Sequence, residues 1–135
     1  MAADGLVTLR SNFGPGETMS RLEAMVKAKG LTVFAHIDHA AGALAAGLTL
    51  RPTDLLVFGN AKGGTPLMQA EQTLGIDLPL KMLVWQDALG ATWLSYNDPQ
   101  WLARRHRPGG DPLPAAAGLA KVLDALANGA AGAGT

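Results

Sequence analysis

The segment Leu80–Gln86 constrains the fold more than any other part of this sequence, because it is apolar at almost every position. Successive side chains of a β-strand point to opposite faces, so Leu83 and Trp85 lie on one face while Met82 lies on the other. A strand that is apolar on both faces needs cover on both. The sequence therefore predicts a sheet with a helical layer on one side. The second cover is another subunit, the segment around Ala40, or a ligand.

Five segments are rich in β-branched, aromatic and other apolar residues, which predicts five strands. They are Leu6–Leu9, Leu31–Asp38, Asp54–Asn60, Leu80–Gln86 and Ala91–Tyr96. Helices are expected at about Glu17–Lys29, in a short glycine-interrupted stretch within Ala40–Leu50, from Pro66 to Gly75, after Asp98, and at about Ala115–Ala127. This order predicts an α+β fold with helices packed on a mostly antiparallel sheet of about five strands.

The length of 135 residues is typical of one domain, which we place at residues 1–127. Residues 128–135 are glycine and alanine apart from Asn128 and Thr135. Such a stretch offers little to bury, so we expect a disordered Gly/Ala tail there.

Charge and cysteine content exclude several classes of protein. Eleven basic residues balance eleven acidic ones, which leaves no electrostatic footprint for nucleic acid or an anionic membrane. The sequence has no apolar run of about 18 residues to span a bilayer, and residues 1–10 do not resemble a signal peptide. The chain has no cysteine, which excludes disulfides and thiolate catalysis and fits a cytoplasmic protein. We expect no cofactor.

Three blocks in order carry a family resemblance. They are IDHAAGALAAGL (Ile37–Leu48), LLVFGNAKGGTPLM (Leu55–Met68) and LPLKMLVWQDALGATWLSYNDP (Leu78–Pro99). Over roughly residues 6–107 the sequence resembles the domain-of-unknown-function 302 family. The resemblance implies a compact α+β fold like that of TATA-binding-protein-like domains, often homodimeric, and it implies no reaction. The family usually has proline after Phe-Gly-Asn, where this chain has Ala61, so the resemblance implies a more mobile loop here.

The glycine-rich loop Gly59–Thr65 is the first candidate binding site. It leads from a strand into a helix, whose first N–H groups lack carbonyl partners and favour an anion. Thr65 is the expected N-cap and Pro66 the first helical residue. The alternative is an ordinary tight turn capped by Thr65. The residues assigned to a small anionic ligand are Asn60, Lys62, Gly63, Gly64 and Thr65.

His36 and Asp38 form the second candidate. Strand alternation places both on one face, with roughly 6.5 to 7 Å between their Cα atoms. A carboxylate beside an imidazole suits general acid–base chemistry. The alternative is that Asp38 caps the segment that follows. His39 falls on the other face, which leaves two of the three ligands that a metal needs, so no metal site is assigned.

Trp85 is the third candidate, because Lys81 and Asp87 share its strand face. An aromatic side chain with a few polar groups is typical of a small-molecule pocket, although an ordinary core has the same composition.

Two functions follow from these patterns. A homodimeric small-ligand-binding or regulatory module that dimerises through its sheet is favoured by the two-sided strands, the 16% of charged residues and the lack of a catalytic template. The alternative is a small enzyme that uses the His36/Asp38 pair beside the anion-binding loop. Metal or haem binding through a histidine is a third hypothesis.

Overall fold

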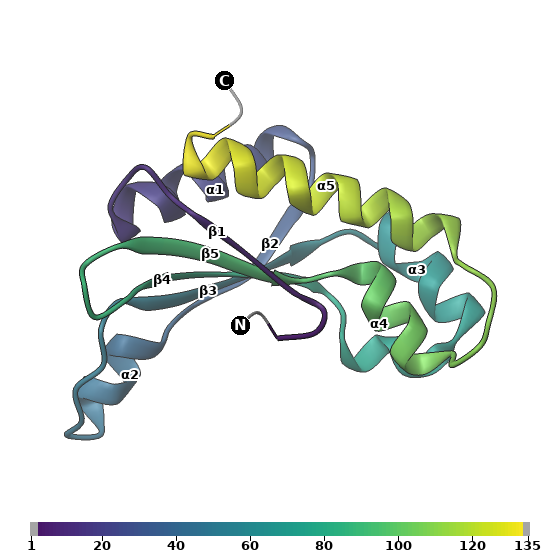
Figure 1. Cartoon of the computed structure of the whole chain (residues 1–135), viewed down its shortest axis with the longest axis horizontal. Coiled ribbons are helices and arrows are strands. Elements are labelled where there is room, and N and C mark those ends of the chain that lie inside the picture. The colour runs from purple at the N-terminus through teal and green to yellow at the C-terminus, as the bar shows by residue number, and fades with distance from the viewer. Residues whose placement is uncertain (1–2, 134–135) are drawn as a thin grey trace.

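The computed structural model describes residues 3–133 and contains a five-stranded antiparallel sheet (Figure 1). Its strands are β1 (Leu6–Arg10), β2 (Thr32–Asp38), β3 (Thr53–Gly59), β4 (Leu80–Gln86) and β5 (Thr92–Asn97). They lie in the order β1-β5-β4-β3-β2, and every neighbouring pair is antiparallel. The predicted α+β class and the five-stranded sheet are confirmed.

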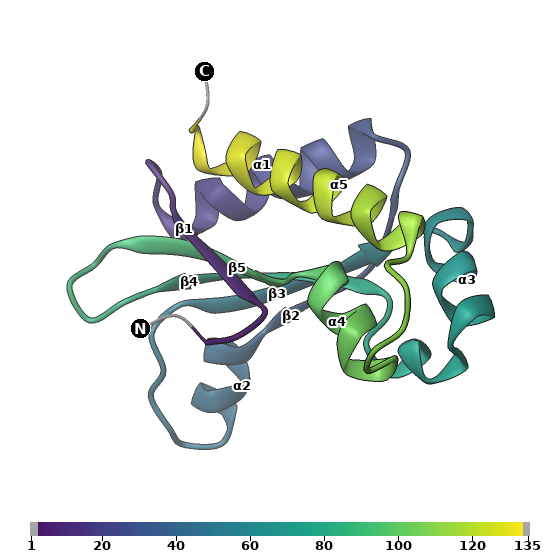
Figure 2. The ribbon, with the colours of Figure 1, turned by 45° about the vertical axis from the view of Figure 1, so that its right-hand side comes forward.

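Helices lie on both sides of this sheet, but they cover the two faces unequally. They are α1 (Pro15–Ala28), α2 (His39–Ala45), α3 (Ala61–Ala70), the 3-10 helix η1 (Gln72–Ile76), α4 (Pro99–His106) and α5 (Pro114–Ala131). Figures 1 and 2 show α1 and α5 side by side across one face, while α2 lies on the other side and α3, η1 and α4 gather at one end. No helix in residues 3–133 is both long and apolar enough to cross a bilayer.

The main core lies between the sheet and the pair α1 and α5. Its fully buried side chains include Leu22 and Val26 from α1, Phe58 from β3 and Leu126 from α5. Burying each such side chain contributes about 1.5–3 kcal/mol relative to leaving it in water. The apolar stripe that the sequence predicted for α1 therefore faces the sheet.

The C-terminal segment differs from the prediction. Helix α5 continues to Ala131, and Ala130 and Ala131 are fully buried against the core. The expected disordered tail at 128–135 is therefore wrong for residues 128–133, while residues 134–135 lie outside the described part of the chain. Small side chains are the reason for this packing, because α1 and α5 approach closely: a Cβ atom on Gly129 would lie 2.1 Å from Met25 Cε.

The second face of the sheet, which we call the open face, has only partial cover. The register places Leu55, Val57, Leu83, Trp85, Trp93, Leu6 and Ile37 on it. The first five are half-buried, whereas Leu6 and Ile37 are 40% and 42% exposed. The prediction of apolar side chains on both faces holds, but within this chain only one face has a full helical layer.

Candidate functional site

A cavity of about 570 Å³ lies where the end of β3, the start of α3 and the middle of α5 meet. This volume is within the range of small-molecule sites. Its walls come from β2, the loop Gly59–Gly64, α3, the segment Gly75–Leu80 and α5. The lining residues are Leu31, Phe34, Gly59, Asn60, Ala61, Lys62, Gly63, Gly64, Met68, Gly75, Leu78, Pro79, Leu80, Leu119 and Val122. The glycine-rich segment Gly59–Gly64 therefore forms one wall of the cavity.

Asn60 determines how the loop enters α3. Its side chain accepts a hydrogen bond from the Gly63 N–H at 2.7 Å, so the helix begins at Ala61. The prediction that Thr65 caps this helix and Pro66 begins it is wrong. Asparagine is the stronger N-cap, and it lies five residues earlier. Pro66 is instead inside α3, and the exposed Thr65 does not line the cavity.

Close packing explains why a glycine is tolerated inside α3. A Cβ atom on Gly63 would lie 3.2 Å from both Asn60 Oδ1 and Leu119 Cδ2, so the missing side chain lets α3 approach α5. Gly64 is less crowded, because its Cβ atom would meet Leu78 Cδ1 at 3.6 Å. The helix also ends at Ala70 rather than at the predicted Gly75, which lies in η1.

The interior of the cavity is apolar with one charged residue at its wall. Among the described residues that line it, Lys62 alone carries a charge, and the side-chain oxygen of Asn60 is already used as the helix cap. The N–H groups of Ala61 and Lys62 are in the first turn of α3, where no helical carbonyl precedes them. Chemically, the cavity suits an apolar body with one negative group near Lys62.

Phe34 contributes a wall that the sequence pattern did not indicate. The pairing of β2 with β3 shifts between Val33 and Ala35, which makes Phe34 the extra residue of a bulge. Its ring is 56% exposed and lies beside Gly59, where an added Cβ atom would be 4.0 Å from Phe34 Cε2. Simple alternation predicted Phe34 on the face of His36, and no turn residue marked the bulge.

The predicted ligand residues therefore separate into two groups. Asn60, Lys62, Gly63 and Gly64 line the cavity together, and Thr65 does not. Trp85 is elsewhere, on the open face, where its Nε1 donates to Ser95 Oγ at 2.9 Å. The leucines and methionine that complete the cavity looked like ordinary core residues in the sequence.

The His36 and Asp38 pair does not form in the predicted way. Both residues are on the helix-covered side of β2, but His36 Nε2 is 3.2 Å from Asp54 Oδ1 and its Nδ1 is 3.9 Å from Glu23 Oε1. Asp38 instead accepts the Ala41 N–H at 2.8 Å and caps α2. His36 does not line the cavity either. Among residues 3–133, no group of three His, Asp or Glu side chains is arranged to hold a metal ion.

One polar cluster was not predicted from the sequence. His106 at the end of α4 contacts Asp77 Oδ2 through Nε2 at 2.6 Å and Thr73 Oγ1 through Nδ1 at 2.8 Å. Lys81 donates to the carbonyls of Asp77 and Pro79, and burial lowers the pKa of its ammonium group despite the nearby Asp77. Asp77 lies within the segment Gly75–Leu80, and Thr73 and Lys81 lie on either side of it, so the cluster holds one wall of the cavity in place.

Comparison with known proteins places the fold in a family. The sequence model of the family described as domain of unknown function DUF302 matches residues 7–127, so the similarity continues past residue 107 and includes most of α5. A crystal structure of an uncharacterized conserved DUF302 protein from Bacillus stearothermophilus superposes with a TM-score of 0.82 at 26% identity, over 93% of this chain and 98% of that one.

Two curated relatives from Brucella are similar over part of their length. Fluoride-specific ion channel FluC 1 of Brucella suis biovar 1 and fluoride-specific ion channel FluC 2 of Brucella melitensis biotype 1 are each 50% identical over 105 residues, or 78% of this chain. The match spans 41% and 39% of those proteins. More than half of each relative therefore lies outside the match.

Proposed function

The chain belongs to the DUF302 family, and from that premise we propose that it is a homodimeric module that binds a small ligand in the cavity beside α3. The cavity of about 570 Å³ is the observation that carries the proposal. It is within the size range of ligand sites, and it combines an apolar interior with the charge of Lys62. The lack of cysteine supports a cytoplasmic location.

The lining defines the chemistry of the ligand. A small hydrated anion such as phosphate or fluoride would have to give up water for an apolar wall, which is costly without several donors. A molecule with an apolar body and one carboxylate or sulfonate avoids this cost. Its body lies against Leu78 and Leu119, and its anionic group stays near Lys62 and the first N–H groups of α3.

The test is binding of 8-anilino-1-naphthalenesulfonate to the native chain, followed by fluorescence and by displacement with decanoate. We expect saturable binding that Gly64→Met weakens at least tenfold, since its Cβ atom fits but the longer side chain fills the cavity. The matched control is Gly118→Met, which is exposed on α5 with nothing within 4 Å of its Cβ atom. Equal binding by the two variants contradicts the cavity as the site.

The homodimer is supported by the open face. Leu83, Trp85 and Trp93 form an apolar surface with incomplete cover, and such surfaces are typical of protein–protein contacts. Light scattering at micromolar concentration is expected to give twice the chain mass of 13.9 kDa. A monomer under these conditions contradicts the proposed dimer.

An enzyme that uses His36 and Asp38 has less support. Asp38 is occupied as the cap of α2, and the cavity does not include His36. In the strand register His36 pairs with Leu56, three residues before Gly59, or about 10 Å along the strand. We therefore favour binding over catalysis.

A second candidate function rests on the Brucella relatives. Those proteins are named as fluoride channels, and a channel needs membrane-spanning segments. No helix of residues 3–133 provides one, so we propose that this domain acts beside the channel rather than as its pore. The test measures fluoride flux through the unmatched part of the Brucella suis protein in liposomes, with and without this chain. A change in flux is expected, and unchanged flux together with no binding contradicts it.

A further inference from the structure

Phe34 is an exposed aromatic side chain in the wall of the cavity. Its ring is 56% exposed, although the residue lines the cavity beside α3. Of the described residues that line this cavity, Phe34 alone is aromatic. An exposed phenyl ring gains little from packing within its own chain, and a molecule that covers it removes apolar area from water. The ring is therefore placed to contact a ligand rather than to stabilise the core.

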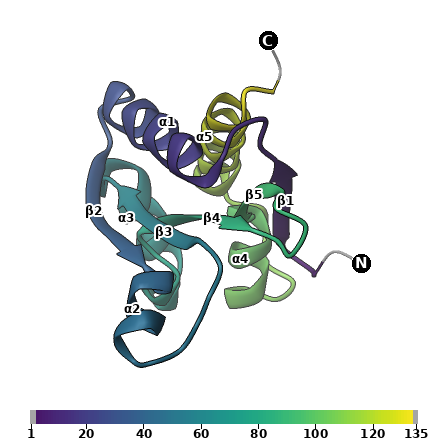
Figure 3. The same cartoon turned by 90° about the vertical axis from the view of Figure 1, so that its left-hand side faces the viewer.

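A β-bulge sets the direction of this ring. Strand β2 is at the edge of the sheet, and Figure 3 shows it along one side, with β5 and β1 on the opposite side. Its pairing with β3 shifts between Val33 and Ala35, so Phe34 has no partner in the register. The ring lies beside Gly59, where an added Cβ atom would be 4.0 Å from Phe34 Cε2. Bulges often re-aim a side chain next to a functional site.

The cavity has an aliphatic interior and an exposed mouth. The larger side chains of the interior are buried or half-buried and carry no ring and no charge: Leu31, Met68, Leu78, Leu80, Leu119 and Val122. The lining residues that are exposed to solvent are Phe34, Asn60, Ala61, Lys62, Gly75 and Pro79. Among these, Phe34 offers an aromatic ring and Lys62 an ammonium group. A ligand that enters therefore meets one aromatic and one positive side chain at the mouth.

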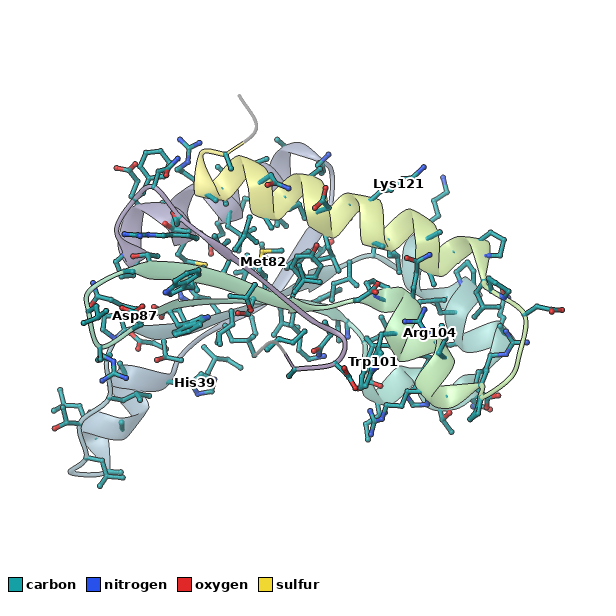
Figure 4. All side chains as sticks on the ribbon, viewed as in Figure 1. His39, Met82, Asp87, Trp101, Arg104 and Lys121 are labelled. Atoms are coloured by element: carbon teal, nitrogen blue, oxygen red, sulfur yellow. The ribbon has the colours of Figure 1, made fainter. Side chains whose placement is uncertain are left out.

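The positive charge at the mouth comes from Lys62. Lys121 is on α5, the helix that also supplies part of the interior, but Figure 4 shows it pointing outward from α5 and it does not line the cavity. Lys62 is three residues after Gly59, and three residues of chain span at most about 11 Å. Because Phe34 lies beside Gly59, its ring and the Lys62 ammonium group can contact the same small molecule. The anionic group of that molecule must then be attached close to the part that contacts Phe34.

We propose that the ligand is an aryl acid. Its aromatic ring packs against Phe34, a carboxylate or sulfonate on that ring is held near Lys62, and an aliphatic substituent occupies the interior of the cavity. This inference rests on the proposed function of the cavity and adds the chemical class of its ligand. Pairs of aromatic rings are favoured beyond the area that they bury, through offset or edge-to-face contacts. Phe34 is then the residue that selects aryl acids over straight-chain acids.

The test compares 4-butylbenzoate with undecanoate by isothermal titration calorimetry. Both acids have eleven carbon atoms and one carboxylate, so they differ in the ring. We expect the native chain to bind 4-butylbenzoate about three- to tenfold more tightly, the usual gain from an aromatic pair. Phe34→Leu is expected to remove this preference while the affinity for undecanoate stays within about twofold, because leucine keeps an apolar side chain at the mouth. The control is Ile37→Ala, which is also exposed on β2 but outside the cavity and is expected to bind both acids as the native chain does.

The outcomes separate this inference from the proposed function. If the native chain binds neither acid, the proposed binding function fails together with the inference. If undecanoate binds as tightly as 4-butylbenzoate or more tightly, or if Phe34→Leu weakens both acids equally, selection of aryl acids by Phe34 is wrong while the cavity stands as a binding site. Nuclear Overhauser effects give a second readout, and we expect them between the ring protons of 4-butylbenzoate and those of Phe34. Effects to Trp85 or Trp93 instead overturn the inference.

Discussion

Asn60 accepts a hydrogen bond from the backbone N–H of Gly63 at 2.7 Å, and this contact fixes the start of α3 beside the cavity. The residue comes directly after Gly59, whose φ of +153° is a conformation that favours glycine. The turn from β3 into α3 therefore depends on two adjacent residues, one for the backbone and one for the cap.

Replacing Asn60 by alanine removes this cap. We expect Asn60→Ala to lower the free energy of unfolding by about 1 kcal/mol, because the Gly63 N–H loses its acceptor. The measurement is urea unfolding followed by circular dichroism. Thr65→Ala is the control, since Thr65 is exposed and lies inside α3, and its effect is expected to stay within about 0.5 kcal/mol. Equal effects of the two substitutions would contradict Asn60 as the cap.

The contrast between Asn60 and Thr65 shows what the sequence predicts well and what it does not. Strand positions followed from runs of apolar residues, because those runs also form the core. The loop contained two good N-cap residues within six positions, and local preference did not choose between them. Tertiary packing decides where α3 begins, since a helix that starts at Ala61 places Gly63 against Leu119.

The bulge at Phe34 and the buried end of α5 were missed for related reasons. An extra residue in a strand changes the pairing partner without changing the composition of the segment. Glycine and alanine after Asn128 suggested disorder, yet small side chains are what allow α5 to lie close to α1 at Gly129. In both places long-range contacts override the local pattern. The bulge also affects the cavity, because Phe34 forms part of its wall.

Removing the charge of Lys62 tests the chemistry of the ligand. Lys62→Met keeps most of the stem and is expected to weaken decanoate binding about two- to fivefold, as for an exposed ion pair worth up to about 1 kcal/mol. Binding of decanol, which has no charge, is expected to be unchanged. Isothermal titration calorimetry measures both. A loss that is equal for the two ligands would show that the charge of Lys62 is not the recognised feature.

Gly5 is a position where both backbone and space require glycine. Its φ is +75°, and a Cβ atom would lie 2.2 Å from Cδ2 of Trp101 on α4. Gly5→Ala is expected to cost about 1–2 kcal/mol for the backbone and a further 1–3 kcal/mol for the displaced indole. Gly109 has nearly the same φ, +74°, with nothing within 4 Å, so Gly109→Ala should show the backbone cost alone. Thermal unfolding of both variants measures how much stability each loses relative to the native chain. Equal losses of stability would contradict the close contact between Gly5 and Trp101.

Acid should weaken the hairpin between β4 and β5 through Asp87. The Trp93 indole N–H and the Ala91 and Leu89 N–H groups donate to its carboxylate and lower its pKa. Because the folded pKa is the lower one, the stabilisation is complete above the ordinary aspartate pKa of about 4 and is lost as the pH falls through the folded value. The free energy of unfolding of the native chain should therefore exceed that of Asp87→Asn at neutral pH, and this difference should disappear below about pH 4. Chemical unfolding at pH 7, 5, 4 and 3 measures this, and a constant difference would contradict it.

The most direct test of the central claim is a map of ligand contacts in solution. Amide chemical shifts of the native chain, recorded during titration with decanoate, are predicted to change at Asn60–Gly64, at Leu78 and at Leu119–Val122. Changes centred on Trp85 and Trp93 of the open face instead, or no saturable changes at all, would contradict the cavity beside α3 as the binding site.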